Sequence, residues 1–280
     1  MTPPNPVPST DGVQLAVHDL GGAGPTLLIS HATGFHGRCY IPVADALADR
    51  FHSVAFDYRG HGDTPQPERP IDWERYGDDA LAMAQALVAA SGAPLVAFGH
   101  SMGGACLLMA AHRDPSLFAR LVLFEPIVFP TEGVRPPGED SPLVGGARRR
   151  RSSFASYEAA IANFAAKPPL NAFTPEALEA YVRYGFAQAP DGTVHLKCRP
   201  EIESGTFELG GKHDTWSVLE SIEVPVVVAA GRAEETQPPS LVAEEVAAKL
   251  PNGRFARLAA LDHFAPMTAP EVIADVIAAG

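Results

Sequence analysis

Seven short runs of apolar, largely β-branched residues constrain the fold of this chain more than any other feature. They cover residues 13–18, 25–30, 52–57, 94–99, 120–124, 224–230 and 254–258. Runs of this length, bounded by glycine and proline, are typical of strands in a parallel sheet that is covered on both faces. The first run is expected at an antiparallel edge of that sheet.

Segments with the periodicity of a helix separate these apolar runs. Within 78–90 the apolar side chains fall on one helical stripe, and 105–111 and 240–250 also have helical character. Pro270 and Glu271 open a last helix, since proline loses no needed hydrogen bond at that position and an acid suits the helix dipole. This βαβα alternation predicts an α/β fold with a doubly wound, mostly parallel sheet.

The alternation is interrupted between residues 130 and 216, where no comparable apolar run occurs. Ser156, and Thr174 with Pro175, form good helix starts there. We therefore expect a core of residues 1–129 and 217–280 and an inserted helical cap at 130–216. The cap aromatics either select the substrate or fill the cap's own core; they are Tyr157, Phe164, Tyr181, Tyr184 and Phe186.

Composition narrows the class of protein. Of the 280 residues 46% are hydrophobic and 19% charged, which suits a chain that buries a sizeable core. The net charge of −12 would repel nucleic acid, and no stretch reaches the roughly 18 apolar residues of a membrane span. Cys39, Cys106 and Cys198 show no metal-ligand spacing, so we expect a reducing cytoplasm. A small molecule is the expected partner; a homo-oligomer is left open.

Four consecutive arginines, at positions 148–151, begin within the predicted cap. We favour a solvated helix start for this basic run over a role in binding an anion.

The segment from Gly99 to Gly103 has the pattern G-x-S-x-G between a predicted strand and a predicted helix. A serine on such a sharp turn projects its hydroxyl above the sheet, and the glycines allow the strained backbone to pass. Ser101 is therefore the candidate nucleophile. Its base is expected in the loop after the last strand, where His263 stands.

These features together resemble the α/β-hydrolase superfamily, and the loop from Asp57 to Thr64, which contains Arg59-Gly60-His61-Gly62, adds to the likeness. The resemblance spans nearly the whole chain. It points especially to the capped serine hydrolases, a branch that includes esterases, C–C hydrolases and haloperoxidase-like enzymes. It implies catalysis by a serine, without a cofactor or a metal.

The resemblance also implies an oxyanion hole of two backbone N–H groups, one of them from Met102, which follows the serine. The second comes from the loop 31–37, which departs from the family's histidine-glycine pair. One alignment makes Phe35 the donor and is favoured; the other makes it Thr33. The imidazoles of His31 and His36 are expected to brace this loop.

An acid must orient the histidine, and two loops can supply it. The loop after the strand at 224–230 holds Glu234 and Glu235, and we favour Glu235. The rival is Glu125, which follows the strand after the serine.

The expected activity is hydrolysis of an ester or related acyl bond in a small to medium, apolar substrate through an acyl-enzyme. The same residues suit a C–C hydrolase, a lactonase, a hydroxynitrile lyase or a non-catalytic ligand receptor. A carboxylate nucleophile, as in epoxide hydrolases, is disfavoured because position 101 is serine.

Overall fold

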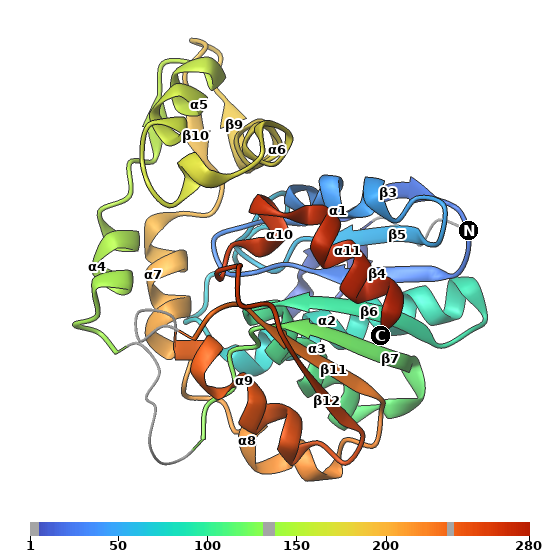
Figure 1. Cartoon of the computed structure of the whole chain (residues 1–280). Helices are drawn as coiled ribbons and strands as arrows, with labels where there is room; N and C mark the ends of the chain where they lie inside the picture. The colour runs from blue at the N-terminus through green and yellow to red at the C-terminus, as the bar shows by residue number, and fades with distance from the viewer. Residues whose placement is uncertain (1–5, 131–137, 234–237) are drawn as a thin grey trace.

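A seven-stranded sheet forms the centre of the computed structural model, which describes residues 6–130, 138–233 and 238–280 (Figure 1). The strand order is β12-β11-β7-β6-β4-β5-β3, and all pairs are parallel except β3 with β5. The strands are β3 (Val17–Gly22), β4 (Thr26–Ser30), β5 (His52–Phe56), β6 (Leu95–His100), β7 (Phe118–Phe124), β11 (Val226–Ala230) and β12 (Gly253–Arg257). The expected α/β class and the antiparallel edge are both confirmed.

The edge strand begins later than the sequence suggests. Residues 13–18 divide between β2 (Gln14–Leu15), which pairs with β1 (Val7–Pro8), and the start of β3. β3 then continues through Gly21 and Gly22 across an irregularity after Asp19. An edge strand tolerates such a break because only one side of it must pair.

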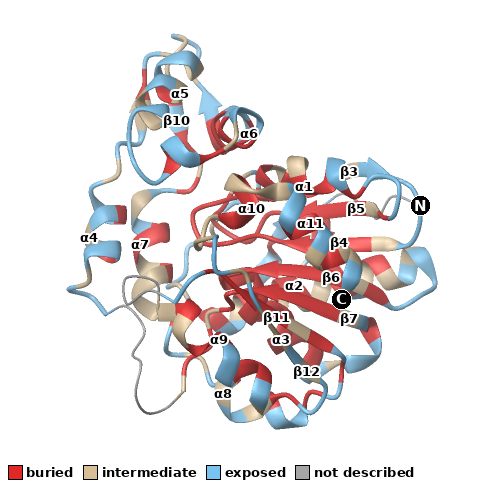
Figure 2. Cartoon of the chain, in the orientation of Figure 1, coloured by how far each residue is buried: buried red, intermediate tan, exposed pale blue. Residues whose placement is uncertain are grey.

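Two apolar cores cover the two faces of the sheet, because alternate residues of each strand point to opposite sides. In β4, Leu28 joins the core under α2 (Trp73–Ser91), α3 (Met102–Arg113) and α9 (Pro238–Lys249). Its neighbours Leu27 and Ile29 join the core under α1 (Ile41–Ala46) and α11 (Pro270–Ala279). The inner strands β4, β5, β6, β7 and β11 are accordingly buried along most of their length, whereas the edge strands β3 and β12 are largely exposed or half-buried (Figure 2).

Several helix boundaries have clear local causes. α2 begins before the expected position because the carboxylate of Asp72 accepts a hydrogen bond from the N–H of Glu74 at 3.0 Å. It ends at Gly92, whose φ of 72° suits glycine. The short helices are α8 (Thr215–Val218), α10 (Ala265–Thr268) and the 3-10 turns η1 (Thr10–Gly12), η2 (Gly37–Tyr40), η3 (Pro115–Leu117), η4 (Leu170–Ala172) and η5 (Leu219–Ser221).

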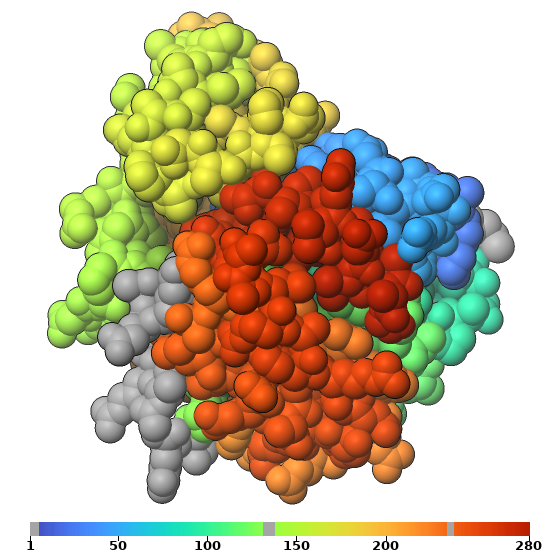
Figure 3. Space-filling view, viewed as in Figure 1, coloured from blue at the N-terminus to red at the C-terminus, as the bar shows by residue number. Residues whose placement is uncertain are grey.

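The segment between β7 and α8 forms a lobe beside the sheet, coloured yellow-green to gold in Figures 1 and 3. Its helices are α4 (Pro142–Arg148), α5 (Tyr157–Ala165), α6 (Pro175–Gly185) and α7 (Pro200–Leu209). Ser156 and Thr174 cap α5 and α6, each accepting a backbone N–H at 3.2 Å, as predicted. The division of the chain at residues 130 and 216 stays a prediction.

This lobe also contains a small sheet, which differs from the expectation of a purely helical segment. The antiparallel strands β8 (Ser153–Phe154), β10 (Val194–Leu196) and β9 (Phe186–Gln188) lie side by side in that order. Strands of two or three residues are too short to display an alternation in the sequence.

None of the helices in the described part of the chain combines the length and the apolar character that a membrane span requires.

Candidate active site

Ser101 occupies a strained turn between the end of β6 and the start of α3. Its φ of 56° lies in the left-handed region, which costs a non-glycine residue about 1–3 kcal/mol. The turn is held by a hydrogen bond from the Ser101 N–H to the carbonyl of Phe124, at 2.9 Å. A Cβ on Gly99 would lie 2.7 Å from the Cα of Gly104, so this crossing of strand and helix requires glycine.

His263 reaches Ser101 from the loop between β12 and α10. Its Nε2 lies 3.1 Å from Ser101 Oγ, and its Nδ1 lies 2.6 Å from an oxygen of Glu125. A carboxylate only accepts hydrogen bonds, so Nδ1 carries the hydrogen and Nε2 accepts from the serine hydroxyl. The structure thus aligns a serine, an imidazole and a carboxylate in the order that acyl transfer requires.

Glu125 is the carboxylate that meets His263. It is fully buried directly after β7, with a φ of 47°, and its N–H donates to the carbonyl of Ala229 at 2.9 Å. Its second oxygen accepts from the N–H of Gly231 at 2.8 Å. Both carboxylate oxygens are therefore fixed in position.

The sequence favours Glu235 for this role, whereas the carboxylate seen in contact with His263 is that of Glu125. Glu234 and Glu235 lie outside the described residues; in the described part of the same loop, the backbone N–H of Gly231 donates to Glu125. The reason is the sheet: β7 and β11 are neighbours, so the loops that follow them meet at one edge.

The backbone hydrogen bonds bear on the choice between Phe35 and Thr33 as the second oxyanion donor. The N–H of Phe35 donates to the carbonyl of Ala32 at 3.1 Å and so closes a turn at Gly34. Among the described residues, no acceptor is found for the N–H of Thr33 or for that of Met102 at the start of α3. Thr33 borders the same cavity as Ser101. The structure therefore favours Thr33 over Phe35, while the role itself stays a prediction.

Two histidines, His31 and His36, support the loop 31–37. His31 Nδ1 donates to the carbonyl of Ala32 at 2.8 Å, and its Nε2 accepts the N–H of Tyr58 at 3.0 Å. Burial lowers the pKa of His31 to about 3. His36 Nε2 lies 3.2 Å from the carbonyl of Tyr181, and burial lowers its pKa to about 4. Neutral, buried and engaged in this way, both imidazoles brace the backbone.

A chain of hydrogen bonds joins the loop 31–37 to His263. The N–H of Ala32 donates to Tyr40 Oη at 3.1 Å, and Tyr40 Oη lies 2.8 Å from His100 Nδ1. His100 Nε2 lies 2.8 Å from the carbonyl oxygen of His263, so this nitrogen is the donor. Burial lowers the pKa of His100 well below its usual value. The imidazole is therefore neutral, and Tyr40 donates to its Nδ1.

Ser101 and His263 open into a cavity of about 440 Å³. Its walls are largely apolar, with Phe35, Trp73, Leu170, Phe207 and Phe264 among them. Of the cap aromatics, Tyr181 lines this cavity. By contrast, Phe164 packs against Phe154 and Phe186, and Tyr184 is exposed beneath Arg38. Phe164 and Phe186 therefore fill the interior of the lobe, and Tyr184 lies on its surface against Arg38.

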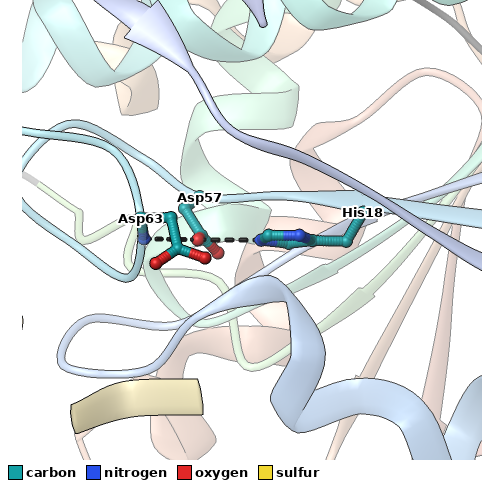
Figure 4. Close-up of side chains that lie close together, drawn as sticks. All are labelled: His18, Asp57 and Asp63. Atoms are coloured by element: carbon teal, nitrogen blue, oxygen red, sulfur yellow. Dashed lines mark hydrogen bonds and ion pairs between the residues drawn. The ribbon is translucent and has the colours of Figure 1, made fainter. Parts of the chain in front are cut away.

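In the described part of the chain, one group of side chains has possible ligand atoms close enough together to hold a metal ion: His18, Asp57 and Asp63 (Figure 4). The oxygens of Asp57 are already engaged: Oδ2 meets His18 Nε2 and the N–H of Asp63, each at 2.8 Å, and Oδ1 accepts the N–H of Gly37 at 2.7 Å. Burial alone would raise the pKa of Asp57, but the hydrogen bond and charge of His18 lower it overall. This cluster clamps the loop after β5 to β3.

A family model for alpha/beta hydrolases matches residues 27–276. The chain belongs to the alpha/beta hydrolase family. Among solved structures, this alpha/beta hydrolase is similar to E-2-(acetamidomethylene)succinate hydrolase, with a TM-score of 0.77 and 20% identity over 97% of this chain and 96% of the other. A likeness at that identity supports the fold.

Curated relatives match a shorter part of this alpha/beta hydrolase. It is 34% identical to 2-(acetamidomethylene)succinate hydrolase of Mesorhizobium japonicum over 104 residues, 37% of this chain and 36% of that protein. It is 31% identical to pimeloyl-acyl-carrier-protein methyl ester esterase of Xanthomonas oryzae over 99 residues, 35% of this chain and 36% of the relative. The match thus spans about a third of the length of these relatives.

Proposed function

We propose that this alpha/beta hydrolase is a serine hydrolase that cleaves an ester or related acyl bond of a small to medium, largely apolar substrate. The observation that carries the proposal is the contact of His263 with both Ser101 Oγ, at 3.1 Å, and Glu125, at 2.6 Å, at the wall of an apolar cavity. Curated relatives named as a hydrolase and as a methyl ester esterase support the same reaction class.

In the proposed mechanism Ser101 Oγ attacks the carbonyl carbon while its proton passes to His263 Nε2. Glu125 balances the imidazolium that forms, and the N–H groups of Met102 and Thr33 stabilise the oxyanion. Collapse of this intermediate expels the leaving group, which takes the proton from His263 and leaves an acyl-enzyme. Water then attacks in the same manner, with His263 as base, and releases the acid and Ser101.

The lobe between β7 and α8 acts in this proposal as a cap over the substrate. Leu143 of α4, Tyr181 of α6 and Phe207 of α7 line the cavity together with core residues. Substrates of moderate size fit a cavity of about 440 Å³.

The test is labelling of the enzyme by a fluorophosphonate, combined with turnover of methyl and short-chain aryl esters. Ser101→Ala should abolish labelling and lower kcat by a factor of about 10⁴ or more, with thermal stability nearly unchanged. Ser141→Ala is the matched control, since Ser141 borders the same cavity and its hydroxyl instead caps α4 at 3.2 Å. Turnover that survives Ser101→Ala contradicts the mechanism, and labelling without turnover favours a ligand receptor.

A further inference from the structure

One member of the arginine run faces the cavity. Arg150 lines it with 26% of its side chain exposed, whereas Arg148 pairs with Glu208 on the outside of the lobe at 2.7 Å. Arg151 stacks over Phe154, 4.3 Å from the ring centroid. Among the described residues that line the cavity, Arg150 is the only lysine or arginine. A permanent cation in a largely apolar wall requires a polar partner, because burying a charge without one is costly.

The guanidinium of Arg150 is held at both of its terminal nitrogens. Its Nη1 donates to Tyr181 Oη at 2.6 Å, and its Nη2 lies 2.9 Å from an oxygen of Glu203. Glu203 is buried, and it packs against Gly34, where a Cβ would lie 2.5 Å from the same carboxylate oxygen. The ion pair is thus anchored on the loop that carries Thr33, close to the proposed oxyanion hole.

Arg150, Tyr181 and Glu203 form one corner of the cavity, and the hydrogen-bonding groups of this corner that have no partner among the described residues are mostly donors. A guanidinium has five N–H groups, and among the described residues no partner is found for Arg150 Nε. Tyr181 Oη accepts from Arg150, so its own hydrogen stays available for an acceptor. Both side chains border the cavity that contains Ser101. An acceptor-rich ligand group would complement this corner.

We propose that Arg150 and Tyr181 bind a carboxylate on the acyl side of the substrate, so that the preferred substrates are monoesters of short dicarboxylic acids. The planar fork of arginine matches a carboxylate and forms strong charge-assisted hydrogen bonds with it. The apolar walls then accommodate the carbon chain between the carboxylate and the scissile carbonyl. This inference rests on the proposed function, because it assigns the substrate class of the same cavity.

Glu203 opposes the negative charge of such a substrate and limits how strongly it binds. Burial raises the pKa of Glu203, although the charge of Arg150 acts against the shift. Its second oxygen is buried and has no hydrogen-bond partner among the described residues. Substitution of Glu203 by glutamine should keep the packing against Gly34 while removing the repulsion. Arg150 and Glu203 should therefore affect substrate choice in opposite directions.

The experiment compares kcat/KM for monomethyl and dimethyl esters of glutarate, adipate and pimelate, measured as methanol release at pH 7. The wild type should prefer the monoesters. Arg150→Gln should lower the ratio of monoester to diester kcat/KM by about 10- to 100-fold, the range of one charge-assisted interaction. Glu203→Gln should raise that ratio several-fold. Arg148→Gln, in the same run but outside the cavity, is the matched control and should leave it unchanged.

Equal use of monoesters and diesters by the wild type, or an equal loss for both with Arg150→Gln, would overturn the inference. A second measurement separates it from the proposed function: calorimetric binding of adipate to the Ser101→Ala variant with and without Arg150→Gln. If no ester is turned over yet adipate binding depends on Arg150, the proposed function fails and the carboxylate site stands. If Ser101-dependent hydrolysis shows no preference for monoesters, the carboxylate site fails alone.

Discussion

His100 Nε2 donates a hydrogen bond to the backbone carbonyl oxygen of His263 across 2.8 Å. His100 directly precedes Ser101 in the chain, so a single residue is tied both to the serine and to the histidine that must meet it. Through Tyr40 the same imidazole is linked to Ala32, the neighbour of Thr33. The parts of the proposed site therefore share one buried set of hydrogen bonds.

Tyr40→Phe should disturb that set without touching the substrate. The change removes the donor to His100 Nδ1 and leaves the N–H of Ala32 unpaired, which should cost about 1–3 kcal/mol of unfolding free energy. Tyr40 links the loop 31–37 to His100 and so to His263. Because the change removes this link, kcat should fall about 10-fold while KM stays nearly constant. Steady-state kinetics and urea unfolding measure both effects. A loss of stability with kcat intact would make Tyr40 a structural residue alone.

Glu125→Gln should lower kcat by about 10³- to 10⁴-fold, as expected when the orienting carboxylate of a triad loses its charge. The glutamine amide would offer a donor to His263 Nδ1, which favours the tautomer whose Nε2 cannot accept the serine proton. Glu235→Gln and Glu234→Gln, both from the loop after β11, serve as controls with little expected loss. If Glu235→Gln instead matched His263→Ala in kcat, Glu125 would not be the triad acid.

Stability should decline in acid because several buried histidines must be protonated on unfolding. Burial lowers the pKa of His61 to about 4, against about 6.5 in an unfolded chain. Its contribution is therefore complete above pH 6.5 and is lost as the pH falls toward 4. Burial likewise lowers the pKa of His31 to about 3, and those of His36 and His213 to about 4.

The variant His61→Asn tests this explanation, because asparagine keeps an N–H for the carbonyl of Arg59 but does not titrate. Between pH 6 and 4.5, its unfolding free energy should fall less steeply than that of the wild type, by up to about 1.4 kcal/mol per pH unit. Urea unfolding at several pH values measures the slope, with the exposed His195→Asn as control. An unchanged slope would show that His61 takes up no proton on unfolding.

Much of the framework could be predicted because its signals are local. Apolar runs of strand length, separated by helical periods, indicated the sheet, and Ser156 and Thr174 marked helix starts by their own capping hydrogen bonds. The pairing of Ser101 with His263 could also be anticipated. Glycines at 99 and 103 permit the sharp turn at the serine, and the histidine stands between the last strand and the last helix.

The remaining features were decided by the tertiary structure, because they depend on contacts between residues far apart in the chain. The neighbouring positions of β7, β11 and β12 bring Glu125 to Gly231 and to His263. The orientation of Arg150 follows from a buried partner, Glu203, 53 positions along the sequence. Periodicity and capping report the neighbours of a residue along one helix or strand, whereas the partner of a buried charge is set by how those elements pack.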